Sequence, residues 1–151
     1  MTADAAATIS SSSMPAWARV VAAGGLLWSL FGLYQFASTA FASEAALRNS
    51  GMTAEQAALY VGLPSWMTVV FATGVLGGVL GCVLLLLGRR LASAVLLVSL
   101  LAYLALYAGD YALGVFAAFG PPQVAVLTTV VLIAAALLFL ARRLSERGAL
   151  R

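Results

Sequence analysis

The sequence predicts an all-α membrane protein, a bundle of four transmembrane helices with a short helical periplasmic loop. Two observations predict it: 64% of the residues are hydrophobic and only 9% are charged, and the mean hydropathy is +1.06. A typical soluble domain is about a quarter charged. So few charges cannot cover a water-soluble globule of 151 residues. The composition therefore excludes a soluble enzyme, a nucleic-acid-binding protein and a disordered chain.

The charged residues divide most of the chain into four long uncharged stretches. About 20 apolar residues cross the hydrocarbon core of a bilayer, so each stretch holds one span. The stretches are continuously apolar and do not alternate, which favours helices over a β-barrel. A transmembrane domain is expected over 15–147, with spans near 17–41, 65–87, 91–111 and 122–141.

The arginines predict the orientation of the spans, because basic residues are enriched on the cytoplasmic side. Only Arg48 falls on the other side. Both termini are therefore expected in the cytoplasm, in a bacterial inner membrane. Residues 1–14 are rich in Ala, Ser and Thr and are expected to form a disordered cytoplasmic tail, with a second, short tail at 148–151. Seven arginines fall on the predicted cytoplasmic side: Arg19, Arg89, Arg90, Arg142, Arg143, Arg147 and Arg151.

The long polar connection, 43–63, predicts two short helices. The first covers 43–48 and is closed by Asn49-Ser50-Gly51. In the second, Thr53 and Gln56 have the spacing of a capping box, and Gly62 ends the helix. These helices are expected to rest on the membrane or on the mouth of the bundle. A lid or a partner-docking surface is the functional alternative.

Four glycines in the second span predict close helix packing. Gly74/Gly78 and Gly77/Gly81 are two overlapping pairs with the small-xxx-small spacing that brings helix backbones together in lipid. Packing within the bundle is the expected use. Homo-oligomerisation through the second span is the alternative.

The sequence offers no recognisable catalytic, cofactor or metal site. It has no histidine and no lysine, and its one cysteine, Cys82, lies in an apolar run. A metal cluster and a nucleophile–base pair both lack the residues they need. We therefore expect a protein that is not an enzyme, carries no cofactor or metal and binds no nucleic acid.

A cavity in the bundle is a further hypothesis. Aromatic faces with an amide suit a neutral polyol or sugar, although each such residue could also belong to an interfacial belt. Asp110 is the one charge whose burial is uncertain; it is expected near the outer interface, solvated or paired with Arg48. Burial in the membrane would instead make it a proton or cation site. The candidate lining residues are Trp28, Tyr34, Gln35, Tyr103, Tyr107 and Asp110.

The segment after the third span, 112–120, is apolar and either prolongs that helix or folds back along the interface. Pro121 and Pro122 then break the chain before the fourth span.

The chain resembles a group of small four-span inner-membrane proteins of alphaproteobacteria that are often labelled sugar transporters. The resemblance lies in 26–32, in 52–56 through Pro64-Ser65-Trp66, and in 74–81 followed by Arg89-Arg90. It implies the four-span architecture and hints at transport. The expected function is that of a small transporter-like protein for a neutral polar solute such as a sugar; the alternative is a non-transporting accessory or structural membrane protein that binds a protein partner.

The predicted orientation can be tested by cysteine labelling in a Cys82→Ala background. A membrane-impermeant thiol reagent should label Ser50→Cys in intact cells and Arg147→Cys only after the membrane is opened. The reverse pattern would overturn the orientation.

Overall fold

The computed structural model describes residues 13–151, and this part of the chain forms seven α-helices and no strand. Four of them are long and apolar enough to cross a membrane, which confirms the all-α four-helix fold. The disorder expected for 1–14 falls almost wholly outside the described residues. The helices are α1 (Ala16–Ala40), α2 (Glu44–Asn49), α3 (Ala54–Val61), α4 (Ser65–Leu86), α5 (Leu91–Ala112), α6 (Val115–Phe119) and α7 (Pro121–Glu146).

The four long helices follow the predicted spans closely. The largest difference is at the end of α7, which continues from the expected position 141 to Glu146. Hydropathy marks where the apolar surface stops, whereas Arg142, Arg143 and Glu146 are good helix formers that extend the helix beyond it. Pro15 and Pro64 precede the first residues of α1 and α4, where the fixed φ of proline is compatible with a helix start.

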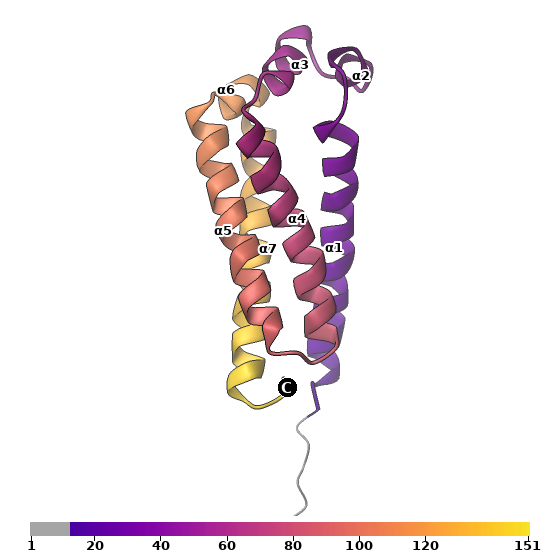
Figure 1. The fold of residues 1–151 in the computed structure, drawn as a ribbon, viewed down its shortest axis with the longest axis vertical. Helices are drawn as coiled ribbons and strands as arrows, with labels where there is room; N and C mark the ends of the chain where they lie inside the picture. Colours follow the sequence, from indigo (N-terminus) through magenta and orange to yellow (C-terminus); the bar gives the residue numbers. More distant parts are fainter. Residues whose placement is uncertain (1–12) are drawn as a thin grey trace, which may run out of the picture.

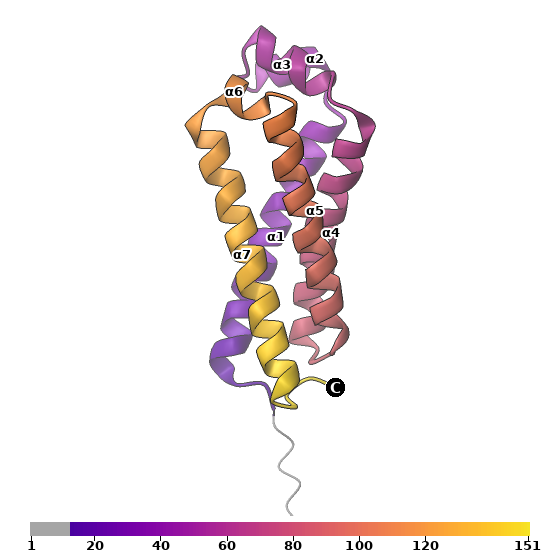
Figure 2. The ribbon, with the colours of Figure 1, turned by 90° about the vertical axis from the view of Figure 1, so that its left-hand side faces the viewer.

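The long helices form an antiparallel bundle in which α4 lies between α1 and α5, and α7 packs mainly on α5 (Figure 1). We call the end that carries α2, α3 and α6 the loop end. The opposite end holds the α4–α5 turn and the C-terminus, and we call it the arginine end because seven of the eight arginines lie there. Contacts between α1 and α7 are few, because α1 crosses the bundle and leaves α7 toward the loop end (Figure 2).

The loop-end helices form where the sequence predicts them. The Ser43 hydroxyl accepts a hydrogen bond from the Ala46 N–H at the start of α2, and Thr53 and Gln56 form the reciprocal capping box of α3. After α5 the chain folds back instead of prolonging that helix, and two glycine turns make this possible. Gly114 (φ 77°) and Gly120 (φ 73°) adopt left-handed backbone angles, so the chain folds back as α6 over the loop end.

The four glycines of α4 make the packing of the bundle possible, because each faces a neighbouring helix. A Cβ at Gly74 would meet the Tyr103 ring, one at Gly77 would meet Ser99, and one at Gly81 would meet Leu96. All three neighbours belong to α5. The Ser99 hydroxyl also donates a buried 2.6 Å hydrogen bond to the Gly74 carbonyl, which joins the two helices.

Gly78 lies on the side of α4 that faces α1, and a Cβ there would lie 2.9 Å from the Ser29 hydroxyl oxygen. The glycines thus face neighbours within the same chain. Homo-oligomerisation through this span stays a prediction, and it would have to use the outward face of α4, where Val69, Leu76 and Leu80 are exposed.

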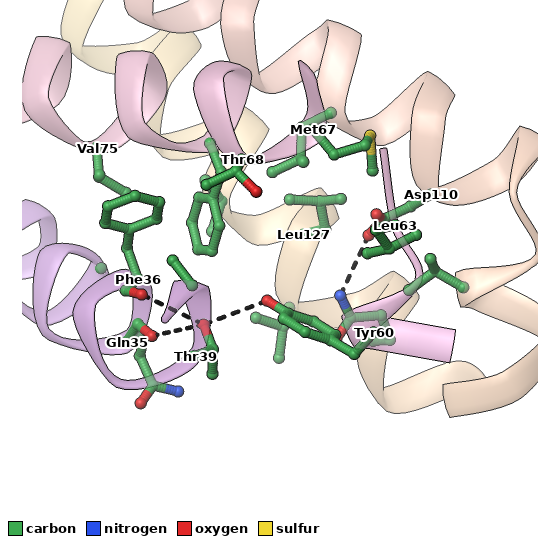
Figure 3. Close-up of a pocket in the computed structure, with 18 of the residues that line it drawn as sticks. Gln35, Phe36, Thr39, Tyr60, Leu63, Met67, Thr68, Val75, Asp110 and Leu127 are labelled. Carbon is green, nitrogen blue, oxygen red and sulfur yellow. Dashed lines mark hydrogen bonds between the residues drawn. The ribbon is translucent and has the colours of Figure 1, made fainter. Parts of the chain in front are cut away.

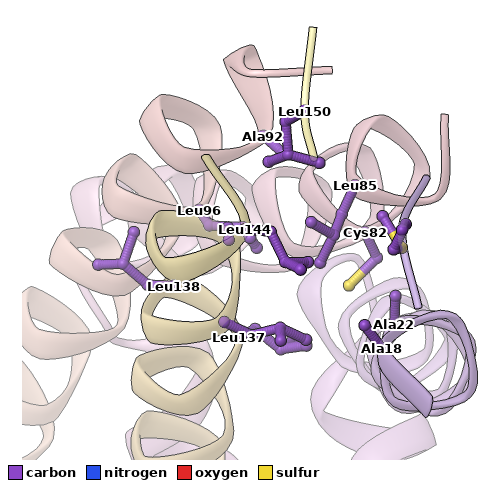
Figure 4. Close-up of a cluster of buried hydrophobic side chains, with 13 residues drawn as sticks. Ala18, Ala22, Cys82, Leu85, Ala92, Leu96, Leu137, Leu138, Leu144 and Leu150 are labelled. Atoms are coloured by element: carbon purple, nitrogen blue, oxygen red, sulfur yellow. The ribbon is translucent and has the colours of Figure 1, made fainter. Parts of the chain in front are cut away.

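The arginine-end half of the bundle is filled by apolar side chains (Figure 4). Ala18 and Ala22 leave room for α7 to approach α1, and Leu137 and Leu144 of α7 point into this space beside Cys82. Cys82 is a buried free thiol and acts here as a small apolar residue. The core is completed from both ends of the described chain: Met14 is 7% exposed and Leu150 is 1% exposed.

The C-terminal segment is folded onto the α4–α5 turn. The backbone N–H of Arg90 donates to the Arg151 carbonyl at 2.8 Å, and the Arg151 N–H donates to the Gly88 carbonyl at 2.6 Å. The Arg90 side chain adds a hydrogen bond to the Leu150 carbonyl. The last residues therefore close the arginine end of the bundle.

Gly77→Ala should destabilise the bundle by about 1–3 kcal/mol. The new Cβ would lie 3.0 Å from the Ser99 Cβ and 3.3 Å from its Cα, so the α4 and α5 backbones would have to separate. Gly24→Ala is the matched control, because its Cβ meets nothing within 4 Å. Unfolding of the two variants and the wild type in detergent measures the difference. Equal stability of both variants would contradict the proposed packing.

Candidate functional site

A cavity of about 370 Å³ lies in the loop-end half of the bundle, between α1 and α7 (Figure 3). It exists because α1 moves away from α7 toward the loop end, and α4 and α5 form its back wall. It extends from the loop-end helices to Val75 and Tyr103, near the middle of α4 and α5. Its lining includes seven aromatic side chains: Trp28, Phe31, Phe36, Tyr60, Phe71, Tyr103 and Phe119.

The mouth of the cavity is marked by the lining residues that stay exposed. Phe31 of α1 is 56% exposed, Val126 of α7 is 58% exposed, and Gln35 is also exposed. These residues flank the gap between α1 and α7, so the cavity opens sideways between the two helices. Val61 of α3, also exposed, extends the mouth to the loop end. The mouth is therefore mostly apolar, and Gln35 is the polar residue among those that flank it.

The polar groups of the cavity gather toward the loop end. Asp110 lines the cavity and is only 5% exposed, and its Oδ2 accepts a 3.2 Å hydrogen bond from the Gln123 side-chain amide. Gln123 replaces the expected partner Arg48, which is exposed on α2. Asp110 is buried rather than solvated because α6 folds back over the end of α5. A carboxylate has about four acceptor positions, so Asp110 keeps acceptor capacity for a ligand.

The helix α3 covers the loop end of the cavity and is joined to two neighbours. The Tyr60 hydroxyl donates a 3.2 Å hydrogen bond to Thr39 of α1, and the Gln56 amide donates to the Ala118 carbonyl of α6. The rings of Tyr60 and Phe119 also pack edge to face, 6.4 Å apart. These contacts hold the loop as a cover over the cavity. Burial raises the pKa of the Tyr60 hydroxyl, and the negative charge of Asp110 raises this pKa further.

Four of the six candidate lining residues, Trp28, Gln35, Tyr103 and Asp110, line the cavity. Gln35 lies at its rim, with its amide directed away from the other lining side chains (Figure 3).

The other two candidates lie outside the lining. Tyr34 is 67% exposed on the outer surface of α1. Tyr107 packs its ring 4.9 Å from that of Phe116, and its hydroxyl accepts a hydrogen bond from Thr128. Steps of four residues rotate by about 40° along a helix, so a stripe that begins at Tyr103 turns away from the cavity at Tyr107. Tyr111, one step further, is 79% exposed.

Four polar lining residues lie outside the candidate set: Thr39, Tyr60, Thr68 and Gln123. Thr39 could have been found from the sequence, since it follows Gln35 by four residues and thus shares its helix face. Gln123 is an amide at the start of the fourth span, so the reasoning that favours Gln35 favours it too. Tyr60 carries no such signal, because only the folding of α3 over the cavity brings it there.

The site has the properties of a small-molecule binding site. Its volume falls within the range of about 300–1,000 Å³ that is typical of such sites, and a few polar groups stand among apolar and aromatic walls. No group of three potential metal ligands occurs in the part of the chain that the structure describes. The arrangement can bind a small solute by ring stacking at its deep end and by hydrogen bonds at its loop end.

The raised pKa of Tyr60 predicts a pH dependence. The protonated Tyr60 contributes stability below its ordinary pKa of about 10, and this contribution is lost as the pH rises through the higher folded-state value. The difference in tyrosinate absorbance between the wild type and Tyr60→Phe should therefore have its midpoint above about pH 10. A midpoint at or below that value would mean that Tyr60 is not buried in the cover.

Comparisons of this chain with known proteins give no match, neither to a protein-family model, nor to a curated protein sequence, nor to a solved structure.

Proposed function

We propose that this multi-pass membrane protein is a small transporter-like protein that binds a neutral polar solute, such as a sugar, in the loop-end cavity. The observation that carries the proposal is the depth of this cavity, which runs from the cover helix α3 to the middle of the bundle. A solute at the deep end of this cavity would lie near the middle of the membrane-spanning helices. A structural protein gains nothing from such a space, because unfilled volume forfeits packing energy.

The residues that line the loop-end cavity suit a sugar. Sugars combine hydroxyl groups with an apolar face, and the cavity combines hydrogen-bonding groups at the loop end with aromatic rings at the deep end. Asp110, Gln123 and Thr39 supply acceptors and donors, while Trp28 and Tyr103 supply the rings. The apolar mouth favours a solute or a derivative that itself has an apolar part.

A second function, that of a non-transporting accessory protein, is favoured by the opposite half of the bundle. There the apolar cluster around Cys82, Leu137 and Leu144 fills the space between the helices. The cavity thus opens sideways between α1 and α7 in the loop-end half and is closed toward the arginine end. Such a protein would hold a solute or a partner at the loop end without moving it across the membrane.

Uptake and binding measurements in proteoliposomes test the proposal, with radiolabelled sugars as solutes. Asp110→Asn should weaken binding about tenfold, because the amide replaces an acceptor by a donor at a buried hydrogen-bonding position. Tyr34→Phe is the control, since this side chain lies on the same half of the bundle but outside the cavity.

A larger side chain placed in the cavity gives an independent test, and the variant and its control both lie on α1. Gly32→Leu places a side chain into the cavity from α1, while Gly24→Leu, two turns away, places the same side chain into open space. The first variant should abolish binding and the second should retain it. Binding without uptake by the wild type would favour the accessory function, and no saturable binding of any sugar would overturn the proposed solute class.

A further inference from the structure

A second hollow of about 350 Å³ lies at the arginine end of the bundle, on the seam between α1 and α7. It is separate from the loop-end cavity and shares no lining residue with it. We call it the arginine groove. Its lining residues are Trp17, Val21, Phe139, Leu140, Arg143, Leu144 and Arg147.

The arginine groove has a basic level and an apolar level. Arg143 and Arg147 are one helical turn apart at the end of α7, and Trp17 lies in the first turn of α1. One turn deeper into the bundle, Val21 and Phe139 are 47% and 60% exposed. The groove therefore presents positive charge at the level of the membrane interface and apolar surface at the level of the hydrocarbon.

Within residues 13–151, the two guanidinium groups of the groove have no acidic partner. Neither Arg143 nor Arg147 forms an ion pair with any residue in the described range 13–151, including the nearby Glu146. The Arg143 guanidinium instead lies over the Phe139 ring, 4.8 Å from its centre, which fixes its position. Arginine stays charged at every accessible pH, and its planar fork matches the geometry of a phosphate group.

We propose that the arginine groove binds an anionic phospholipid, with the phosphate on Arg143 and Arg147 and an acyl chain along Phe139 and Val21. The apolar level of the groove favours a lipid over a soluble phosphate, which would leave that surface uncovered. Trp17 is placed where tryptophan is enriched in membrane proteins, beside the headgroups. Basic pockets between transmembrane helices are suited to anionic headgroups for the same electrostatic reason.

Bound lipid would also act on the fold. The groove lies over the contact of α1 with α7, where Leu140 and Leu144 belong to the buried cluster of the arginine end. A lipid that contacts Trp17 on one helix and Arg143 on the other holds this contact closed. The proposal is independent of solute binding, because the groove and the cavity are at opposite ends of the bundle.

The experiment uses the full chain in bilayers in which Trp17 is the remaining tryptophan, with Trp28→Phe and Trp66→Phe. Quenching by brominated phosphatidylglycerol is compared with quenching by brominated phosphatidylcholine. We expect stronger quenching by the anionic lipid, and a preference that falls about fivefold for each arginine removed in Arg143→Gln/Arg147→Gln. The matched control is Arg89→Gln/Arg142→Gln, which changes the net charge equally at the same end outside the groove.

Three results would overturn the proposal. Equal quenching by the two lipids would exclude selectivity for anionic lipid. An equal loss in the control pair would mean general attraction to the membrane surface rather than a site. Displacement of the lipid by soluble glycerol phosphate would assign the groove to a free phosphate. Should the Arg143→Gln/Arg147→Gln variant fail to fold, Arg143→Lys/Arg147→Lys keeps the charge. The proposal then requires a reduced preference for the anionic lipid, because the bidentate geometry of arginine is lost.

Discussion

The close approach of α4 to α1 and α5 is the constraint on which the rest of the structure depends. It exists because Gly74, Gly77 and Gly81 place no side chain between α4 and α5, and Gly78 places none between α4 and α1. In lipid there is no hydrophobic force to hold helices together, so this contact is stabilised by dispersion and by the buried Ser99 hydrogen bond. The three helices thereby form a fixed layer.

The fourth helix then decides where space remains. It packs mainly on α5 and reaches α1 at the arginine end, where Ala18 and Ala22 leave room for leucines. Toward the loop end α1 diverges, and aromatic side chains line the gap without filling it. The core of the bundle is therefore filled by side chains at the arginine end and contains a cavity at the loop end. The short helices α3 and α6 cover the hollow half through side-chain contacts such as Tyr60 to Thr39.

The candidate site was predictable only in part, for reasons that differ from residue to residue. Trp28 and Tyr103 follow from the sequence, because an aromatic group on a span tends to pack against a neighbouring helix, and Gln35 follows as the one amide of the first span. Tyr34 was misjudged because composition does not tell which side of a helix faces lipid, and a step of one residue rotates the side chain by about 100°. Asp110 was assigned to a span end correctly, yet its burial depends on α6, and the sequence left the course of that segment open.

The sequence by itself determined the class of protein, the number and limits of the spans and the caps of the loop helices. These follow from local physical chemistry: the length of apolar runs, proline at helix starts and the spacing of Thr53 and Gln56. The tertiary structure alone decided that α1 leaves α7, that a cavity opens there, and that Arg143 and Trp17 meet across a groove. Apolar helix faces are chemically alike, so their pairing and crossing depend on the fit of side chains across the bundle, which no single stretch of sequence contains.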